Sequence, residues 1–419
     1  MKVLGLITEY NPFHLGHKYH LDVSKHIANA DYSIAVMSGS FVQRGEPSIV
    51  DKWTKAKIAI DNGIDLVIEL PFVFSTQSAE LFAYGNIALL NKLNIVDCIS
   101  FGSELGDLNS LKQIAKVLVD EPPYFREKLK DYLGMGYSFP VSRSKALEEY
   151  FNRYNIPQIS AEIVNSILQK SNNILAIEYL KSLEILKSPI KPITIKRIGS
   201  SYNENELNHG IASATAIRNI MLNKDLSTIK KYLPKETFYH LNAYIDKYEY
   251  FNTLGNYSQI FQYLFIDKDK SFLKEIIDVE IGLENRIMEK SIQYNNINNL
   301  IQSISTKRYA KTRIQRILIH LMMGLTKPIF DELYKSYPSY IRVLGANKKG
   351  FALLNEIKRV SNISIITKFA AYKKHNNPNL DRMIYYDKKA TDLFFLGLGL
   401  AKPYVNMDYY VTPYICTKT

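Results

Sequence analysis

Residues 1–119 contain short apolar runs that alternate with amphipathic stretches, and this alternation is the strongest constraint on the fold. The apolar runs predict strands at Lys2–Ile7, Tyr32–Met37, Asp65–Leu70 and Asp97–Gly102. The stretches between them predict helices near 17–29, 49–63, 77–93 and 107–119. Because strand–helix–strand units place successive strands in parallel, we expect an α/β fold with a parallel sheet and helices on both faces.

The rest of the chain divides into three further patterns. Residues 120–190 are mostly helical in pattern and predict a helical insertion, after which Pro192–Ile198 reads as a strand. A new helix is predicted to open near Ser213. We therefore expect a first domain over residues 1–225, and a basic, mostly helical region over 226–419. Ligands of such sheets bind where the strands end, at their carboxyl edge.

Composition narrows the class of protein. The 53 Lys and Arg against 41 Asp and Glu give a charge of +12, which favours a polyanionic partner, although a generally basic background explains it equally well. Cys98 and Cys416 are the only cysteines, so a disulfide framework and a cysteine zinc site are excluded. No apolar run reaches the roughly 18 residues that span a bilayer, so we expect no membrane association and a cytoplasmic location.

The first predicted strand is followed by His14-Leu15-Gly16-His17. Pro12 enforces an extended turn, and a helix begins close to Gly16, so both imidazoles meet the free N–H groups of a helix N-terminus. Such a place binds phosphate, and His14 and His17 can stabilise charge that develops on it. The alternatives are two surface histidines beside a turn glycine, or a metal site of His17 and His20, which lacks suitably spaced acidic partners.

A second phosphate-binding pattern lies near residue 213. Ser213 is a natural N-cap, Thr215 offers a hydroxyl in the first turn, and Arg218 follows one turn later. Hydroxyls, helix N–H groups and a guanidinium together suit the outer phosphates of a nucleotide. An ordinary capped helix is the more common explanation of this pattern alone, and the His-Leu-Gly-His loop reverses that preference.

The two patterns together resemble the nucleotidyltransferase superfamily, although Ala214 replaces a hydroxyl residue that is frequent there. A closer resemblance, to the bacterial tRNA(Met) cytidine acetate ligase family, covers most of the chain. It is carried by these segments: Glu9-Tyr10-Asn11-Pro12-Phe13-His14, Met37-Ser38-Gly39, Gln43-Arg44-Gly45-Glu46-Pro47, Asp65-Leu66-Val67-Ile68-Glu69-Leu70-Pro71, Phe101-Gly102-Ser103-Glu104, Asn172-Asn173-Ile174-Leu175, Lys307-Arg308-Tyr309, Thr312-Arg313 and Gln315-Arg316.

The resemblance implies a two-step reaction and an ATP site. Acetate and ATP give acetyl-adenylate and pyrophosphate, and the acetyl group then passes to N4 of the wobble cytidine of elongator tRNA(Met), without acetyl-CoA. The implied ATP-binding residues are Ile7, Thr8, Glu9, Tyr10, Asn11, Pro12, Phe13, His14, Leu15, Gly16, His17, Lys18, Tyr19, His20, Gly102, one or both of Asn172 and Asn173, Arg197 and Ile198. Gly199 stands where some relatives have serine, so no hydroxyl contact is expected there.

The implied reaction requires few catalytic groups from the protein. Acetate is already ionised at pH 7, so no general base is needed, and His14 and His17 are the expected catalytic residues. Mg²⁺ is expected on the phosphates rather than in a cage of protein ligands, so no metal-binding residues are assigned. For three of the implied ATP contacts, plain structural roles compete: Gly102 as a turn, the two asparagines as helix caps, and Arg197 as a solvated side chain.

A basic stretch begins near residue 307 and is predicted to lie on a helix within Thr306–Met323. Cations follow phosphates and aromatic rings stack on unpaired bases, so with Tyr309 this stretch suits RNA. A solvated helix face is the usual alternative for such a run. The predicted tRNA contacts are Lys307, Arg308, Arg313, Arg316, Lys348 and Lys349.

Three rival functions stay open from the sequence. A small-molecule adenylyltransferase explains both phosphate motifs but leaves the basic C-terminal part without a role. A class I aminoacyl-tRNA synthetase has a similar loop, but no Lys-Met-Ser-Lys-Ser-like segment is present. A non-catalytic RNA-binding protein is disfavoured by the intact His14, Gly16 and His17. No obligate protein partner is expected.

Overall fold

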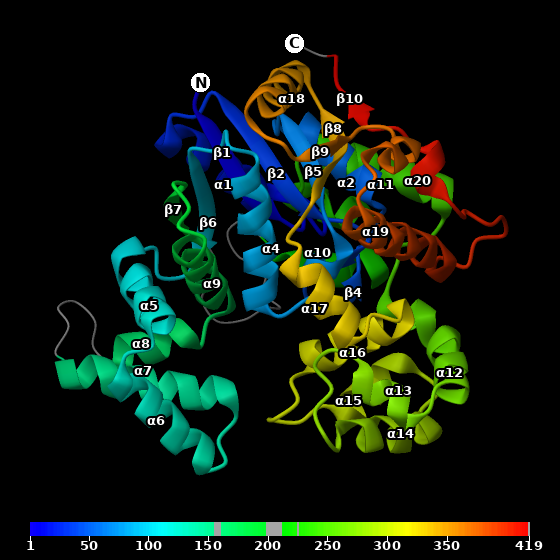
Figure 1. Cartoon of the computed structure of the whole chain (residues 1–419). Helices are drawn as coiled ribbons and strands as arrows, with labels where there is room; N and C mark the ends of the chain where they lie inside the picture. The colour runs from blue at the N-terminus through cyan, green and yellow to red at the C-terminus, as the bar shows by residue number, and fades with distance from the viewer. Residues whose placement is uncertain (155–160, 198–211, 224–225, 418–419) are drawn as a thin grey trace.

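A computed structural model describes residues 1–154, 161–197, 212–223 and 226–417, and its centre is a mostly parallel sheet (Figure 1). Within these residues the strand order is β10-β8-β5-β2-β1-β6-β7, with β9 beside β8. The parallel strands are β1 (Val3–Thr8), β2 (Tyr32–Ser38), β5 (Leu66–Leu70), β6 (Cys98–Ser103) and β7 (Lys191–Lys196). All five strands predicted from the sequence are confirmed, within two residues at each end.

Helices cover both faces of the sheet, as the alternation predicts. On one face, Leu4 and Leu6 of β1 share a core with Leu21 and Trp53 of the helices α1 (Leu15–Ala28) and α2 (Lys52–Asp61). On the other face, Val3 joins a core with α4 (Ala79–Lys92), α9 (Ser171–Ile185) and α18 (Lys348–Val360). Successive β1 side chains therefore enter opposite cores, which fixes the register of the central strand.

The predicted insertion is helical and forms a lobe of its own at the lower left of Figure 1. It consists of α6 (Pro123–Gly134), α7 (Phe139–Tyr154) and α8 (Ala161–Leu168), after α5 (Leu108–Asp120). Helix α9 then returns the chain to the sheet and packs against α4 and α5. The insertion thus leaves and rejoins the sheet beside β6 and β7.

The region after residue 225 is mostly helical, as predicted. Its elements are η1 (Leu226–Tyr232), α11 (Lys235–Tyr248), η2 (Leu254–Tyr257), α12 (Ser258–Asp267), α13 (Lys270–Glu275), α14 (Leu283–Gln293), α15 (Ile297–Ile304), α16 (Lys311–Met323), α17 (Lys327–Lys335), α18, η3 (Phe369–His375), α19 (Pro378–Gly397) and α20 (Met407–Tyr410). Among the described residues, no helix is long and apolar enough to span a membrane.

This region also supplies strands that the sequence did not predict. Strand β8 (Tyr340–Ala346) pairs antiparallel with β5, and β9 (Ser364–Ile366) and β10 (Tyr414–Ile415) pair with β8. Every residue of β8 is buried, and a short run buried on both faces has no alternation that distinguishes a strand from a helix. The boundary at residue 225 remains a prediction, but the sheet itself contains strands from both sides of it.

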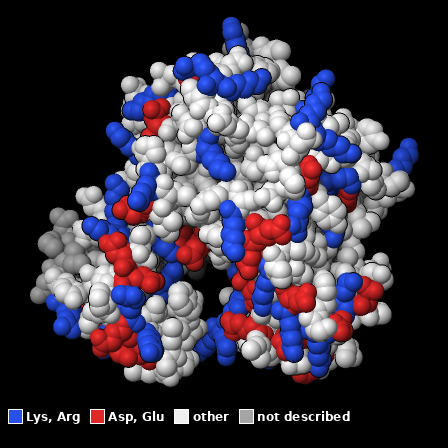
Figure 2. All heavy atoms as spheres, viewed as in Figure 1, with Lys and Arg blue, Asp and Glu red and all other residues white. Residues whose placement is uncertain are grey.

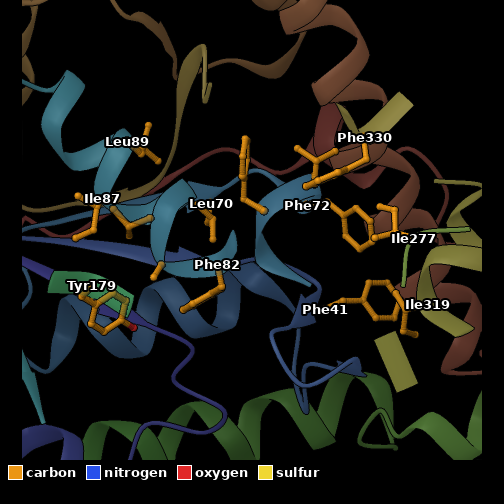
Figure 3. Close-up of a cluster of buried hydrophobic side chains, with 14 of the residues drawn as sticks. Phe41, Leu70, Phe72, Phe82, Ile87, Leu89, Tyr179, Ile277, Ile319 and Phe330 are labelled. Atoms are coloured by element: carbon orange, nitrogen blue, oxygen red, sulfur yellow. The ribbon is translucent and has the colours of Figure 1, made fainter. Parts of the chain in front are cut away.

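One apolar cluster connects the sheet to the C-terminal helices (Figure 3). It includes Phe41, from the short strand β3 (Phe41–Val42), and Phe72, from α3 (Phe72–Ser75), whose rings meet edge to face with centroids 6.1 Å apart. Ile319 of α16 lies beside Phe41 in this cluster. The helical lobe of α12–α16 is therefore held against the sheet by a continuous core.

The parallel strands point their carboxyl ends toward the two helical lobes (Figure 1). The insertion lobe and the lobe of α12–α16 lie on either side, and Figure 2 shows the surface hollowed between them. Lysine, arginine and acidic side chains line both sides of this hollow in that view. The edge of the sheet that carries the His-Leu-Gly-His loop thus faces the hollow.

Candidate active site

The His-Leu-Gly-His loop joins β1 to α1, and its histidines cap their own helix. His14 is the N-cap residue, with extended backbone, and its Nδ1 accepts the N–H of Gly16 at 3.0 Å. The Nδ1 of His17 accepts the backbone N–H of His14 at 3.4 Å, which completes a capping box built from imidazoles. The two rings stack with centroids 3.9 Å apart.

This capping fixes the hydrogen-bonding role of both rings. Because each Nδ1 accepts a backbone N–H, each neutral imidazole carries its proton on Nε2. Burial lowers the pKa of His14 to about 3, with further lowering by Arg197 and Arg218, and burial also holds the pKa of His17 well below its usual value. A hydrogen bond from the His17 ring to the backbone carbonyl of Pro12 opposes this lowering of the pKa without reversing it. Both histidines are therefore neutral Nε2–H donors at pH 7 rather than cations, and a phosphate oxygen would replace the Pro12 carbonyl as the acceptor for His17.

Neighbouring residues hold the loop in place by packing and hydrogen bonding. Tyr10 packs edge to face on Phe13 and His17, with centroids 4.7 and 5.1 Å away. Asn11 is buried, and its Oδ1 accepts the N–H of Ile49 at 2.7 Å. The hydrogen bonds of Asn11 and the aromatic packing of Tyr10 hold the backbone of the loop against α2 and the sheet.

Other predicted loop contacts have separate roles. Lys18 binds Asp22 at 2.8 Å and the carbonyl of Asn62, so its ammonium joins α1 to the end of α2. His20 lies 3.4 Å from the hydroxyl of Ser100, and burial lowers its pKa to about 4. Ile7 and Thr8 belong to β1 itself, and Leu15, Gly16 and Tyr19 belong to the first turns of α1.

The second phosphate-binding pattern reaches the same loop from a distant part of the chain. Ser213 caps α10 (Ala214–Asn223) by accepting the N–H of Ala216 at 3.1 Å, as predicted. Arg218 donates to the carbonyl of Asn11 at 2.9 Å and lies 3.4 Å from the hydroxyl of Thr215. The structure therefore brings the two motifs together, although 207 residues separate Arg218 from Asn11.

Gly102 and Arg197 form one unit at the ends of β6 and β7. A Cβ on Gly102 would lie 3.2 Å from Cγ of Arg197, so the arginine side chain lies across the glycine. Although Arg197 as a residue is exposed, partial burial of its guanidinium lowers its pKa, and the nearby Glu104 opposes that shift. Gly102 thus makes room for Arg197 itself. Ile198 and Gly199 lie outside the described residues.

Asn172 and Asn173 interlock with the loop after β6. The Oδ1 of Asn173, which is 2% exposed, accepts the N–H groups of Glu104 and Leu105 at 2.9 and 3.1 Å. In return Glu104 accepts the side-chain amide of Asn172 at 2.6 Å and the N–H of Asn173 at 2.8 Å. The amide oxygen of Asn173 is thus occupied in holding this loop, whereas Asn172 is half-buried and keeps its amide oxygen for another partner.

Sequence reasoning missed a buried lysine behind the loop. Lys55 donates to the carbonyls of Ser38 at 2.7 Å, Gly39 at 2.9 Å and Glu9 at 3.3 Å, so it joins the ends of β1 and β2. Burial lowers its pKa to about 8. Lys52, one turn earlier, is paired with Glu69 and Asp408. Lys52 and Lys55 lie one turn apart, on the same side of the helix as the apolar residues Ala56 and Ala59, and that spacing was the signal for this buried network.

The predicted RNA-contact residues fall into separate groups. In the basic stretch, Arg308 and Arg313 both pair with Glu280, at 2.9 and 2.8 Å, and Arg316 lies 3.8 Å from Asp278. Lys307 is exposed, and no ion pair is formed by it within the described ranges. The helix begins at Lys311, because residues 306–309 form a turn instead.

Lys348 and Lys349 lie away from this group. They open α18, and the ammonium of Lys349 donates to the carbonyl of Asp31 at 2.9 Å, just before β2 begins. This position is at the amino edge of the parallel strands, opposite the His-Leu-Gly-His loop. Any nucleic acid bound there would lie across the sheet from the candidate active site.

A parallel sheet with a His-Leu-Gly-His loop at its first strand–helix crossing, and with Arg197 and Arg218 around that loop, defines a nucleotide-binding protein of the nucleotidyltransferase class. The family model described as HIGH Nucleotidyl Transferase matches residues 1–404. The chain belongs to this family and, within it, to the tRNA(Met) cytidine acetate ligases, as the following relatives show.

Similarity to these relatives extends over their full lengths. The tRNA(Met) cytidine acetate ligase of Thermoanaerobacter sp. (strain X514) is 48% identical over 397 residues, which is 95% of this chain and 96% of that protein. The enzyme of the same name from Clostridium perfringens (strain ATCC 13124) is 42% identical over 417 residues, 99% and 100% of the two chains. The crystal structure of Thermotoga maritima TmcAL bound with alpha-thio ATP superposes with a TM-score of 0.94, at 33% identity and complete coverage of both chains.

Proposed function

We propose that this chain activates acetate with ATP and transfers the acetyl group to N4 of the wobble cytidine of elongator tRNA(Met), forming N4-acetylcytidine. The observation that carries the proposal is the pair of neutral Nε2–H donors on His14 and His17, beside Arg197 and Arg218 at the carboxyl edge of the sheet. The names of relatives at 42–48% identity support the same reaction. The structural neighbour bound to an ATP analogue supports the nucleotide.

In the proposed first step, a carboxylate oxygen of acetate attacks the α-phosphorus of ATP. The bond from that phosphorus to the oxygen bridging the α- and β-phosphates breaks, and its electron pair leaves with pyrophosphate. Negative charge grows on the phosphate oxygens, where the Nε2–H groups of His14 and His17 and the guanidinium of Arg218 can donate hydrogen bonds. Neutral imidazoles with fixed tautomers need no change of protonation during this step.

In the proposed second step, N4 of the cytidine attacks the carbonyl carbon of acetyl-adenylate. The bond between that carbon and the AMP oxygen breaks, AMP leaves with the electron pair, and the nitrogen releases one proton to solvent. The base must be unstacked and presented to the site from the anticodon loop. The hollow between the two helical lobes gives this loop a route to the carboxyl edge of the sheet (Figure 2).

We propose that ATP contacts the loop from Ile7 to His20, and Gly102, Asn172, Arg197, Ile198, Ser213, Thr215 and Arg218. Asn173 then acts by holding the loop after β6. The carboxylates of Glu9 and Glu104 already accept protein N–H groups, which fits Mg²⁺ carried on the phosphates rather than held by these side chains. Activation by ATP makes acetyl-CoA unnecessary, and the cytoplasm supplies all three substrates.

We also propose that tRNA passes over the basic stretch, with exposed Lys307 and Arg308 as its first phosphate contacts. The ion pair of Arg308 with Glu280 is exposed, so it costs little to exchange that partner for a phosphate. Contacts from Arg313, Arg316, Lys348 and Lys349 remain predictions of the sequence. Elongator tRNA(Met) and acetate are the proposed partners, with no membrane and no obligate protein partner.

The decisive experiment incubates the protein with ATP, labelled acetate and tRNA(Met), omitting each in turn. Pyrophosphate release is expected to require acetate, and labelled N4-acetylcytidine to require all three. Transfer of AMP to a small molecule without acetate would overturn the proposal. His17→Ala should lower the rate of pyrophosphate release by about 10²-fold or more, because a charge-stabilising donor is lost; a change of only a few-fold would remove the loop from the mechanism.

A further inference from the structure

The hairpin formed by β3 and β4 (Glu46–Pro47) lies between the His-Leu-Gly-His loop and helix α16. On the loop side, the N–H of Gln43 donates to Oε1 of Glu9 at 2.8 Å. The side-chain amide of Gln43 donates to the carbonyl of Gln77 at 2.8 Å. The hairpin begins at Phe41, which is fully buried in the core that includes Ile319 of α16 (Figure 3). It is therefore a rigid element.

The other side of the hairpin packs against α16. Gly45 has a φ of 79°, and a Cβ there would lie 2.4 Å from the backbone nitrogen of Arg316, so the turn rests directly on α16. Glu46 accepts the side-chain amide of Gln315 at 3.0 Å, and its other oxygen lies 3.6 Å from the guanidinium of Arg218. Glu46 thus joins α16 to an arginine of the proposed ATP site.

Arg44 stands at the tip of this hairpin, between the two anchored residues Gln43 and Gly45. Its side chain is exposed and forms no hydrogen bond or ion pair within the described residues. Its charge lowers the pKa of Arg197, in addition to the larger effect of burial there. Arg197 likewise has no ion pair in the described part of the chain. The charge of Glu104 acts on Arg197 in the opposite direction and more strongly than that of Arg44, but its carboxylate already accepts N–H groups of Asn172 and Asn173. Both guanidiniums therefore keep donors for an anionic ligand.

We propose that Arg44 is a phosphate-binding residue of this active site. It is carried by a rigid hairpin to the place where the ATP loop, Arg197 and α16 meet, and its planar donors suit a phosphate oxyanion. That phosphate belongs either to the outer end of ATP, and so to the leaving pyrophosphate, or to the tRNA backbone beside the cytidine. The proposal rests on the proposed ligase function, and the two phosphate sources are separated by assays with and without tRNA.

The test compares Arg44→Ala and Arg44→Lys with the wild-type protein and with Arg359→Ala. Arg359 is an exposed arginine of α18 whose side chain pairs only with Glu356 in the described structure, so it controls for loss of a surface charge. Acetate-dependent exchange of labelled pyrophosphate into ATP, without tRNA, reports the first step. If Arg44 binds the outer phosphates, Arg44→Ala raises KM for ATP or pyrophosphate about tenfold or more. Arg44→Lys recovers part of the loss, and Arg359→Ala behaves as wild type.

If exchange by Arg44→Ala is unchanged while tRNA acetylation weakens, the phosphate is that of tRNA. In that case the slope of log affinity against log salt falls by about one phosphate contact. Unchanged exchange, acetylation and salt dependence, relative to Arg359→Ala, would overturn the proposal.

The failure of the ligase function has a different signature. If the wild-type protein shows no acetate-dependent exchange, the proposed ligase function is wrong, whatever the role of Arg44. Stabilisation by ATP alone still tests Arg44 in that case: ATP should raise Tm of the wild-type protein and raise it clearly less in Arg44→Ala. Because the exposed Arg44 side chain forms no hydrogen bond or ion pair with the described residues, Tm without ATP should be the same in both proteins. Equal stabilisation of both by ATP would then count against an ATP-phosphate contact.

Discussion

The carboxyl edge of the sheet and the start of α16 are both rich in arginine, but the arginines are used differently. At the sheet edge, Arg44 and Arg197 have no carboxylate bound to them in the described structure. At α16, Arg313 is paired with Glu280, and Arg316 lies beside Asp278. Arg218 at the sheet edge is intermediate, since its guanidinium donates to the carbonyl of Asn11 and lies 3.6 Å from Glu46. A charged group without a protein partner binds a substrate without first losing one, whereas a paired group must exchange its partner. Charge density alone therefore does not locate the site.

The largest expected difference concerns acetate activation. Arg197→Ala should lower kcat/KM for acetate-dependent pyrophosphate exchange by about 10²-fold, since it removes a cation beside the developing charge. Arg313→Ala should leave the same rate within about threefold, because its guanidinium is engaged by Glu280 and the carbonyl of Asp278, away from the proposed ATP site. Equal losses in the two variants would abolish the distinction between the regions.

The hairpin that separates the two regions gives the next effect. Gly45→Ala places a Cβ against the backbone of Arg316 and forces a left-handed φ on alanine, so we expect a loss of about 1–3 kcal/mol of stability. Exchange should fall as well, because Glu46 and Arg44 move with the turn. Urea unfolding and exchange assays measure both. Gly134→Ala is the matched control, since open space surrounds that glycine.

The sequence predicted the local features of the site but not the long-range pairing of its charges. The strand–helix alternation predicted the parallel strands, and the spacing of His14, Gly16 and His17 predicted the loop, because both are local patterns. The partners of Arg313 and Arg316 are acidic residues about 35 residues earlier, so only the tertiary fold reveals that these charges are neutralised. Arg44 belongs to a segment that carries the family resemblance, but only the fold places its hairpin against α16 and near Arg218.

A smaller effect tests which cations reach tRNA. Lys307→Ala should reduce the slope of log affinity against log salt by about one, since this exposed lysine has no ion pair among the described residues and can release a counterion from a phosphate. Arg316→Ala should leave the slope unchanged and lower Tm instead, because its side chain is 11% exposed and packed near Asp278. If Arg316→Ala reduces the slope as much as Lys307→Ala, the prediction from the sequence is right and the paired arginines also bind RNA.

The smallest effect is a change in acid stability. His320 of α16 is buried, its Nε2 lies 2.7 Å from the carbonyl of Thr76, and burial lowers its pKa to about 4, with Asp278 raising it and Arg316 lowering it. Between the unfolded value of about 6.5 and this folded value, the unfolded chain binds a proton that the native protein does not. Stability from this group is therefore complete above about pH 6.5 and declines as the pH falls toward 4.

His320→Gln removes this titration while keeping a side-chain donor. The fall in Tm between about pH 7.5 and about pH 5 should be smaller in this variant than in the wild-type protein. His26→Gln provides the control, because it makes the same replacement at an exposed histidine of α1. Acetate activation at neutral pH should be retained by His320→Gln, in contrast to His17→Ala. A fall in Tm identical to that of the wild-type protein would show that His320 does not contribute.

The return of β8 to the sheet has a practical consequence for anyone who wishes to isolate the ATP-binding half. Strand β8 covers one side of β5, whose residues are all buried. A protein truncated after the lobe of α12–α16 would leave Leu66–Leu70 as an uncovered apolar edge, which is a template for aggregation. The helical lobe is better removed as an internal deletion that rejoins the chain before β8, because the chain enters the lobe after α11, which packs on α2, and leaves it through α17 toward β8.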